Sequence, residues 1–472
     1  MNNHPSKGFV STENISYSIV IALVAVMTTN YFLPLIAFII VIYAYRIWEE
    51  NLIIFLTLSS FLLITSELSE VFRLFLNLTN LFVLVFFAFF HKKRFYKTKL
   101  LPKQVLIFVL ILLSSLVISA IFSDYMLESL YLSVQQTLFL LLCICYFLLL
   151  DGNRTLNTLV YSLIFVALIV SISVLYQFIE LGTNAFYLQE KIIIRTSGLY
   201  NNPNGVGLLL CCTIPLMLAF FFRRGLKMTT KCLFGGLIVF FFVVLMITDS
   251  RASILAICVS VSVFLYRLNK LYFYRFLKLS FLISLIVLLL FPQMLDYAIL
   301  LIRADRIIVS TRNYFWEEGF QMFNSSPIFG VGPGLFDKYL YKYLPVMLGT
   351  FEEQQMNWAI SGTAHNFFIF RLAEVGIIGL IPGVMLIALF LSYSNKLLIY
   401  FKSLNFEKYL LTLSIFSIGI GMTLRGFFES NGILTHGWIT RDFPFWINFI
   451  IILYFVTEKK KSLDLQESNS YE

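Results

Sequence analysis

The chain has 472 residues, of which 59% are apolar and only 13% carry a formal charge. A soluble domain carries about twice that share of charged residues, so the composition excludes a soluble globular protein. The net charge is +9, but the Lys and Arg residues stand in short clusters between apolar runs, as in a membrane protein and not as in a nucleic-acid-binding protein. The six Cys residues lie in or beside apolar runs and predict neither a disulfide framework nor a metal site.

Fourteen apolar runs follow one another along the chain. Each is a candidate transmembrane helix, although several are shorter than the roughly 20 residues that a span needs. The first run follows a polar leader without a small-residue cleavage site and is interpreted as an uncleaved span. The first two runs are barely separated, so the prediction is an all-α fold: a polytopic integral membrane helical bundle of 12–14 transmembrane helices. The runs cover residues 15–29, 31–47, 51–67, 71–90, 104–123, 128–149, 155–179, 204–222, 232–248, 252–267, 278–292, 376–394, 408–426 and 442–457.

The distribution of basic residues predicts the orientation of these spans. Six loops that alternate with the others contain 21 of the 35 Lys and Arg residues. Because Lys and Arg favour the cytoplasmic side, these loops and both termini are predicted to be cytoplasmic. They are 91–103, 151–157, 223–231, 267–278, 394–408 and 458–461.

The largest loop of the other set, 293–375, lies between two late spans and is predicted to be extracytoplasmic. Within it, residues 310–325 predict a helix with Ser310 or Thr311 as its N-cap. Residues 335–348 mix Tyr, Leu and Lys and predict a segment that lies in the membrane interface.

Ionisable residues inside or beside a span are energetically expensive and are therefore functional candidates. Here they lie mainly at the predicted outer ends of the spans. A transporter is expected to place such groups near the midplane, whereas an enzyme that acts on a lipid head group needs them at the membrane surface. The residues are Glu67, Glu70, Arg73, Asp249, Arg251, Arg371, Glu374, Arg425 and Glu429.

Two short outer segments each present an Arg. In RTSGLYNNPNG, Arg195 precedes Asn202, Pro203 and Asn204, which form a good helix N-terminus and thus favour a nearby anion. A simple turn and cap with Arg195 in solvent is the alternative. In TDSRAS, Arg251 sits in a tight turn, where pairing with Asp249 is the alternative role.

A third outer segment runs from Arg312 to residue 336 and contains GVGPG. This glycine-rich stretch lacks the preceding strand and the following Lys and Ser of a nucleotide-binding loop, so a nucleotide site is not expected. It is followed by AHNFFIFRLAEVGIIGL, which begins a span and contains His365.

The order of these pieces resembles the O-antigen ligase family, which includes polymerases of O-antigens and capsules and ligases that attach glycans to lipid A core or to protein. The resemblance covers about residues 155–395. Its pieces are SGxxxNPN after an outward Arg, then T-x-S-R-A, then R-x-x-x-W with P-I-F-G-V-G-P-G, and last H-N-x(9)-G-x-x-G, which is His365, Asn366, Gly376 and Gly379.

The resemblance implies that a glycan is transferred from an undecaprenyl-diphosphate carrier to an acceptor hydroxyl at the outer face of the bacterial plasma membrane. A diphosphate leaving group needs either a metal with acidic ligands or a set of fixed cations. The outer loop has no closely spaced Asp pair, so guanidinium groups are expected to hold the diphosphate, and no metal or other cofactor is expected. The candidates are Arg195, Arg251 and Arg312, with Asn204 as a supporting residue.

A sugar hydroxyl needs a positioned base, and imidazole suits that role. Of the four His residues, His4 and His91 lie on the predicted cytoplasmic side, which leaves His365 and His436. The family carries its essential His at the position of His365, so this residue is the predicted catalytic base, with Asn366, Gly376 and Gly379 in supporting roles. Capping of a helix is its alternative role. An ordinary loop role is expected for His436, and Glu374 is expected to face away from His365.

The predicted organisation has four parts: N-terminal transmembrane helices over 1–154, an O-antigen ligase-like catalytic region over 155–395, C-terminal helices over 396–457 and a cytoplasmic tail over 458–472. We expect a metal-independent enzyme, inverting by the family's implication. A polymerase of a surface polysaccharide is favoured over a ligase, although the H-N-x(9)-G-x-x-G spacing is one described for ligases. A polysaccharide flippase is the rival from another class. The expected partners are the lipid-linked oligosaccharide, an acceptor glycan and membrane lipid, with other polysaccharide-assembly proteins as candidates and no nucleic acid.

Overall fold

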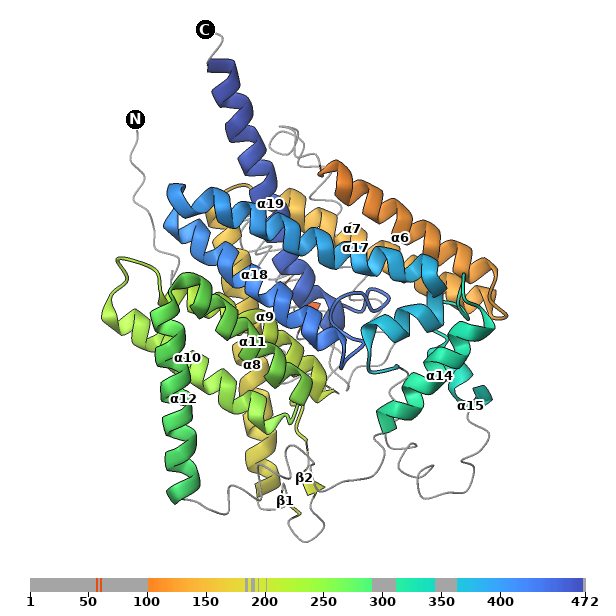
Figure 1. Cartoon of the computed structure of the whole chain (residues 1–472), viewed down its shortest axis with the longest axis horizontal. Coiled ribbons are helices and arrows are strands. Elements are labelled where there is room, and N and C mark those ends of the chain that lie inside the picture. Colours follow the sequence, from red (N-terminus) through yellow and green to blue (C-terminus); the bar gives the residue numbers. More distant parts are fainter. Residues whose placement is uncertain are drawn as a thin grey trace, which may run out of the picture.

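A computed structural model describes residues 101–182, 186–187, 192–193, 195–200, 202–290, 311–343 and 363–469, together with Thr57, Ser60 and Phe61. Apart from those three residues, the first four predicted spans lie outside the described residues, as do His4, His91, Glu67, Glu70 and Arg73. So do residues 291–310 and 344–362 of the large loop. The described part is almost entirely helical (Figure 1).

Ten of the helices are long and apolar enough to cross a membrane. Each coincides with one of the last ten predicted spans, which confirms a polytopic helical membrane protein. They are α6 (Lys103–Ile121), α7 (Met126–Leu149), α8 (Asn153–Leu181), α9 (Pro203–Phe221), α10 (Met228–Ile247), α11 (Arg251–Leu268), α12 (Lys270–Leu290), α17 (Phe367–Leu404), α18 (Phe406–Gly426) and α19 (Ile439–Asn469).

The remaining elements are short and lie between these helices. A two-residue antiparallel pair, β1 (Phe186–Tyr187) and β2 (Ile192–Ile193), precedes α9. Two helices belong to the large loop: α14 (Thr311–Ser325), close to the predicted 310–325, and α15 (Phe336–Tyr343), which covers part of the predicted 335–348 segment.

Asparagine caps explain where three of the helices begin. Asn202 accepts a hydrogen bond from the backbone N–H of Asn204, and Pro203 occupies the first position of α9, as predicted. Asn366 accepts from Phe368 N and Ile369 N at the start of α17. Asn405 ends α17 and accepts from Lys408 N in the first turn of α18, so a single residue joins these two spans.

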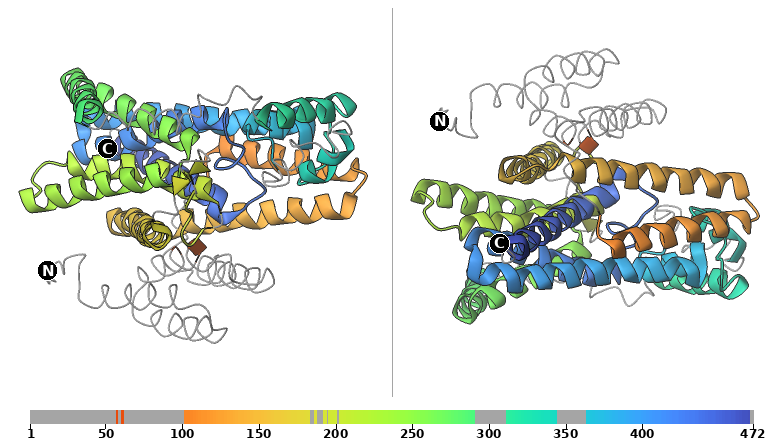
Figure 2. Two further views of the ribbon diagram at one scale, coloured as in Figure 1. Left: turned by 90° about the horizontal axis from the view of Figure 1, so that it is seen from below. Right: turned by 90° about the horizontal axis from the view of Figure 1, so that it is seen from above.

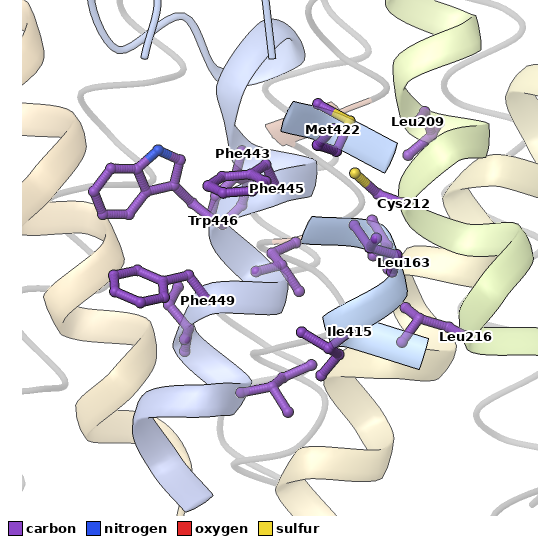
Figure 3. Packing of buried hydrophobic residues seen from close by; sticks show 14 of the residues in the cluster. Leu163, Leu209, Cys212, Leu216, Ile415, Met422, Phe443, Phe445, Trp446 and Phe449 are labelled. Atoms are coloured by element: carbon purple, nitrogen blue, oxygen red, sulfur yellow. The ribbon is translucent and has the colours of Figure 1, made fainter. Parts of the chain in front are cut away.

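The core of the bundle is apolar and lies between α8, α9, α18 and α19. Leu163, Leu209, Ile415 and Phe449 meet there from these four helices (Figure 3). Helix α19 lies between α7 and α17 and contacts both, and its C-terminal part extends beyond the bundle (Figures 1 and 2). The core fixes the helices against one another and so determines which of their ends meet.

The helix ends meet in two groups. Arg223 at the end of α9 pairs with Glu407 in the first turn of α18, and Tyr400 near the end of α17 bonds Ser462 of α19. At the other end, α9, α11, α14 and α17 begin and α10 and α18 end. We call this second group of helix ends, which contains Arg195 and His365, the site end.

Helix α17 is broken at Gly376, whose backbone (φ 67°, ψ −164°) is not helical. The break frees backbone groups that the glycine-rich loop of residues 327–334 satisfies. The carbonyls of Ala373 and Glu374 accept from Val331 N and Gly332 N at 3.0 and 2.8 Å, and Ile377 N donates to the carbonyl of residue 327 at 3.0 Å. The GVGPG stretch therefore stabilises the kink in α17, and the N–H groups of Gly330, Val331 and Gly332 are already used within the protein.

Candidate active site at one end of the helix bundle

Residues from five separate segments meet at the site end. Arg195 precedes α9, Asn204 lies in its first turn, Arg312 lies at the start of α14, His365 precedes α17 and Glu429 follows α18. Side-chain hydrogen bonds connect all five. Four of them were predicted as site residues, and the structure brings these four together around the fifth, Glu429.

Glu429 is the centre of this cluster and its side chain is 1% exposed. Its Oε1 accepts from Asn204 Nδ2 at 2.9 Å and from Arg312 Nη2 at 3.1 Å. Its Oε2 lies 3.2 Å from Nδ1 of His365. An ionised carboxylate can only accept, so the contact places a hydrogen on Nδ1 and, in the neutral ring, leaves Nε2 as the basic nitrogen.

The surroundings of Glu429 keep its carboxyl ionised. Burial alone would raise its pKa, but the charge of His365, the hydrogen bond from that ring, and the guanidinium groups of Arg425 and Arg312 lower it to about 2. Glu429 is thus a fixed negative charge behind the His365 ring at any physiological pH.

His365 stands at the edge of the cluster, with 15% of its side chain exposed. Its backbone adopts φ 48°, a left-handed conformation that is uncommon for residues other than glycine. The ring centre of Phe315, from α14, lies 5.9 Å from that of His365. Glu429 and Phe315 therefore flank an imidazole that solvent or a ligand can still reach. This placement does not match the alternative role as a cap of α17, because Asn366 is the capping residue.

Asn204 joins the cluster to Arg195. The side chain of Asn204 donates to Glu429 and accepts at Oδ1 from Arg195 Nη2 at 2.8 Å and from Ser250 Oγ at 3.0 Å. Arg195 also donates from Nε to the carbonyl of Thr248 at 3.2 Å. The half-buried Arg195 guanidinium is therefore held in place by α9 and the end of α10.

Arg251 is the first residue of α11, and its side chain is exposed. The preceding residue, Ser250, binds Asn204, so Arg251 begins next to the cluster. Within the residues that the structure describes, no group of three His, Cys, Asp or Glu side chains could hold a metal ion. The cations that the structure places at or beside the cluster are guanidinium groups.

Arg425, in the last turn of α18, is fully buried beneath the cluster. It donates to the carbonyl of Asn204 at 3.0 Å, to Ser253 Oγ at 3.1 Å and to the carbonyl of Asn431. These bonds tie α9, α11 and the segment after α18 to α18. Arg425 therefore fixes the helix ends on which the cluster is built, and it contributes to the electrostatics of Glu429.

The predicted supporting residues of α17 have structural roles. Asn366 caps the helix, and its Nδ2 donates to the carbonyl of Phe427 at 3.1 Å. A Cβ on Gly376 would lie 2.3 Å from the carbonyl oxygen of Ile328, so this position requires glycine. Gly379 accepts from Nε of the buried Arg371 at 3.3 Å. These residues hold the kinked helix behind His365.

Two findings go beyond the sequence interpretation. Glu429 and Arg425 were recognised only as charges beside a span, and no role was assigned to them; that charge pattern was the only signal in the sequence. His436, for which an ordinary loop role was expected, is 5% exposed and lies 2.5 Å from the buried carboxylate of Glu374. Glu374 does not bond His365, as expected from its position on α17.

Comparison with known proteins agrees with the predicted resemblance. Residues 236–382 match the model of a family described as O-antigen ligase. The match includes Arg251, Arg312 and His365, whereas Arg195, Asn204 and Glu429 lie outside it. No curated protein matches the chain. The chain is therefore a multi-pass membrane protein in which residues 236–382 are similar to the O-antigen ligase family.

Proposed function

We propose that this protein transfers a glycan from an undecaprenyl-diphosphate carrier to a sugar hydroxyl at the outer face of the bacterial plasma membrane. The observation that carries the proposal is the His365–Glu429 pair at the helix ends, with Asn204 and Arg312 on the same carboxylate and Arg195 one hydrogen bond away. This arrangement combines an oriented base with fixed cations, which is what the reaction requires.

The diphosphate of the donor binds to guanidinium groups. Arg195 is held by α9 and the end of α10, and Arg251 is the exposed first residue of α11. Arg312 completes the set, while its Nη2 also holds Glu429. A guanidinium remains charged at all relevant pH values and offers two parallel N–H donors to a phosphate. Arg residues fixed in this way stabilise the negative charge that develops on the leaving diphosphate without a metal.

His365 accepts the proton of the acceptor hydroxyl. The hydroxyl oxygen forms a bond to the anomeric carbon of the donor glycan, the bond from that carbon to the phosphate oxygen breaks, and its electron pair leaves with undecaprenyl diphosphate. The proton moves to Nε2 of His365, and Glu429 stabilises the imidazolium through Nδ1–H. One direct displacement of this kind inverts the anomeric centre.

The proposed orientation places the site end outside and both termini in the cytoplasm. The basic clusters at residues 223–231 and 394–408 support it, because they adjoin the helix ends opposite to the site. A Cys introduced at the exposed Asp337 should react with a membrane-impermeant thiol reagent in intact cells, in a background with Cys232 and Cys258 replaced. A Cys introduced at Lys461 should react only after permeabilisation. The reverse pattern would contradict the orientation.

We propose that the enzyme is a polymerase of a surface polysaccharide, for which the acceptor is another lipid-linked glycan. A ligase that transfers the glycan to lipid A core or to protein is the alternative. Both use the same donor and the same base. A flippase would move the lipid-linked glycan without changing it, and the O-antigen ligase match at residues 236–382 favours an enzyme instead.

The test is transfer by the purified protein in lipid vesicles, with a synthetic undecaprenyl-diphosphate oligosaccharide as donor. A second lipid-linked oligosaccharide or a core oligosaccharide serves as acceptor in separate reactions, each with and without EDTA. We expect a longer lipid-linked glycan, an inverted linkage and no effect of EDTA. Product only with the core acceptor would indicate a ligase. Loss of the reaction in EDTA, or consumption of no donor with either acceptor, would contradict the proposal.

A further inference from the structure

Two His–Glu pairs connect the same two segments of the chain, and each segment contributes the His of one pair and the Glu of the other. The first segment, 365–374, contains the start of α17, and the second, 429–436, follows α18. In the outer pair, His365 of the first segment meets Glu429 of the second at 3.2 Å. In the inner pair, His436 of the second segment meets Glu374 of the first at 2.5 Å. The outer pair is the proposed base and its carboxylate, so the inner pair needs its own explanation.

The inner pair lies in the protein interior. Glu374 is 1% exposed, and its Oε1 accepts from the backbone N–H of Phe336 at 3.2 Å. The ring centre of His436 is 5.5 Å from that of Phe370, and its Nδ1 has no hydrogen-bond partner within the described residues. Burying such a pair is a poor way to gain stability, because desolvation offsets much of the attraction. A role in fixing geometry is the better explanation.

The segment 429–436 is anchored to its neighbours at both ends. Near its start, the backbone N–H of Asn366 donates to Ser430 Oγ at 3.1 Å. Near its end, the carboxylate of Asp442 accepts from Thr435 N at 2.6 Å, one residue before His436. The inner pair is therefore the side-chain link between the far end of this segment and α17, just before the kink at Gly376.

Both His residues have the same unusual backbone conformation. His365 has φ 48° and His436 has φ 51°, and within the described residues only Asp249 is another non-glycine residue with positive φ. Such conformations are strained and persist where the surrounding structure determines them. Each pair is thus held at a position that the local chain alone would not choose.

We propose that Glu374 and His436 form a positioning pair that sets the place of segment 429–436 against α17, so that Glu429 meets His365 in the geometry of the proposed reaction. This inference rests on the proposed function of His365. Neither residue of the inner pair touches the substrate, and their effect on the reaction passes through Glu429. Small displacements of a catalytic group lower the rate strongly, so loss of the pair should reduce kcat more than it weakens donor binding.

The test compares Glu374→Gln alone and combined with Glu429→Gln, using purified protein. Alone, Glu374→Gln should lower kcat about tenfold to a hundredfold, with donor Kd within about twofold of the unchanged protein. Combined with Glu429→Gln, which already removes the effect of the carboxylate, it should cause less than about a twofold further loss. Equal losses in both backgrounds would show a general structural role and overturn the inference.

Two controls separate positioning from loss of stability. Leu163→Ala creates a cavity in the core, far along the chain from both pairs, and should lower Tm while kcat below the transition stays unchanged (Figure 3). Glu407→Gln breaks the exposed pair with Arg223 at the opposite helix ends and should change neither quantity. The inference would be overturned if Leu163→Ala and Glu374→Gln lowered Tm equally and also lowered kcat equally.

Substitution of His436 gives a second, independent test in case Glu374→Gln does not fold. His436→Gln keeps an N–H donor for Glu374 and should retain a larger share of kcat than His436→Leu, which does not. Equal kcat for these two variants would contradict the inference. If His365→Ala keeps the rate of the unchanged protein, the proposed function itself is contradicted. If His365→Ala loses activity while His436→Leu is fully active, only the positioning role is overturned.

Discussion

Replacement of Glu429 by Gln is the perturbation that tests the site geometry most sharply. The two carboxylate oxygens serve three donors: Asn204 Nδ2, Arg312 Nη2 and His365 Nδ1. Gln has nearly the same size, but only one of its two terminal atoms accepts hydrogen bonds. At least one of the three donors loses its partner, and the negative charge behind the imidazole disappears.

The magnitude follows from these losses. If the amide nitrogen faces His365, Nδ1 must act as the acceptor and the hydrogen moves to Nε2, which can then no longer act as the base. The equivalent Asp-to-Asn change in a serine-protease triad lowers kcat about ten-thousandfold. If the amide oxygen faces His365, the hydrogen bond to Nδ1 is kept without its charge, and the amide nitrogen faces the Asn204 and Arg312 donors instead. The charge-assisted part of a hydrogen bond contributes about 1.5–3 kcal/mol, roughly tenfold to a hundredfold. We therefore expect kcat to fall between about tenfold and ten-thousandfold.

The assay is single-turnover transfer from a synthetic undecaprenyl-diphosphate glycan by the purified Glu429→Gln variant. Glu407→Gln, which loses a carboxylate at the opposite helix ends, is the matched control and should transfer at the rate of the unchanged protein. Donor binding should persist in both variants, because the Arg residues are intact. A Glu429→Gln rate within about twofold of the control would refute the assignment of Glu429 as the carboxylate that orients His365.

Four further outcomes are expected. Arg195→Ala and Arg251→Ala should each lower the transfer rate about a hundredfold in the same assay. Arg→Lys at either position should restore little of the rate, because an ammonium group lacks the planar fork of a guanidinium. A rate near that of the unchanged protein would remove that residue from the mechanism. Gly376→Ala should lower Tm, measured by intrinsic fluorescence, because a Cβ there meets the Ile328 carbonyl at 2.3 Å and φ is 67°; an unchanged Tm would contradict this account of the kink. The pKa of Glu429 is about 2, against an ordinary value of 4.5, and the difference of about 2.5 corresponds to about 3 kcal/mol of folding free energy. This contribution is present above pH 4.5 and is lost as the pH falls toward 2. Glu429→Gln should abolish that part of the pH dependence of the free energy of unfolding. Burial raises the pKa of Glu318 in α14 to about 8, so stability falls as pH rises from 4.5 to 8, and Glu318→Gln should raise Tm at pH 8.5 and change it little at pH 4.5; the opposite order would show that Glu318 has a charge partner.

The sequence predicted the spans of the described part well, because apolar length is a direct consequence of the bilayer thickness. It also predicted the cap at Asn202 and a helix over 310–325, close to the observed Thr311–Ser325, since these depend on local chemistry. The kink of α17 was not foreseen. Gly376 was identified as a motif residue, but its broken helix needs partners from residues 327–332, and such long-range pairing leaves no local pattern.

The site was predicted in part. His365, Arg195, Arg312 and Asn204 were identified from motifs that follow one another in the chain, and the structure joins them. Glu429 was not assigned a role, since it lies 64 residues after His365, with the two helices α17 and α18 between them. An ordinary loop role was expected for His436, whereas the structure buries it against Glu374. The reason is the same, because Glu374 lies in α17, 62 residues earlier in the chain.

Donor binding and glycan transfer, measured in parallel on purified His365→Ala, test the central assignment most directly. In the proposed reaction His365 acts on the acceptor hydroxyl, and the cations proposed to hold the diphosphate are unchanged in this variant. The account predicts a donor Kd within about threefold of the unchanged protein, with transfer reduced about a hundredfold to ten-thousandfold. Transfer at the unchanged rate, or a loss of activity explained entirely by loss of donor binding, would contradict the assignment of His365 as the base.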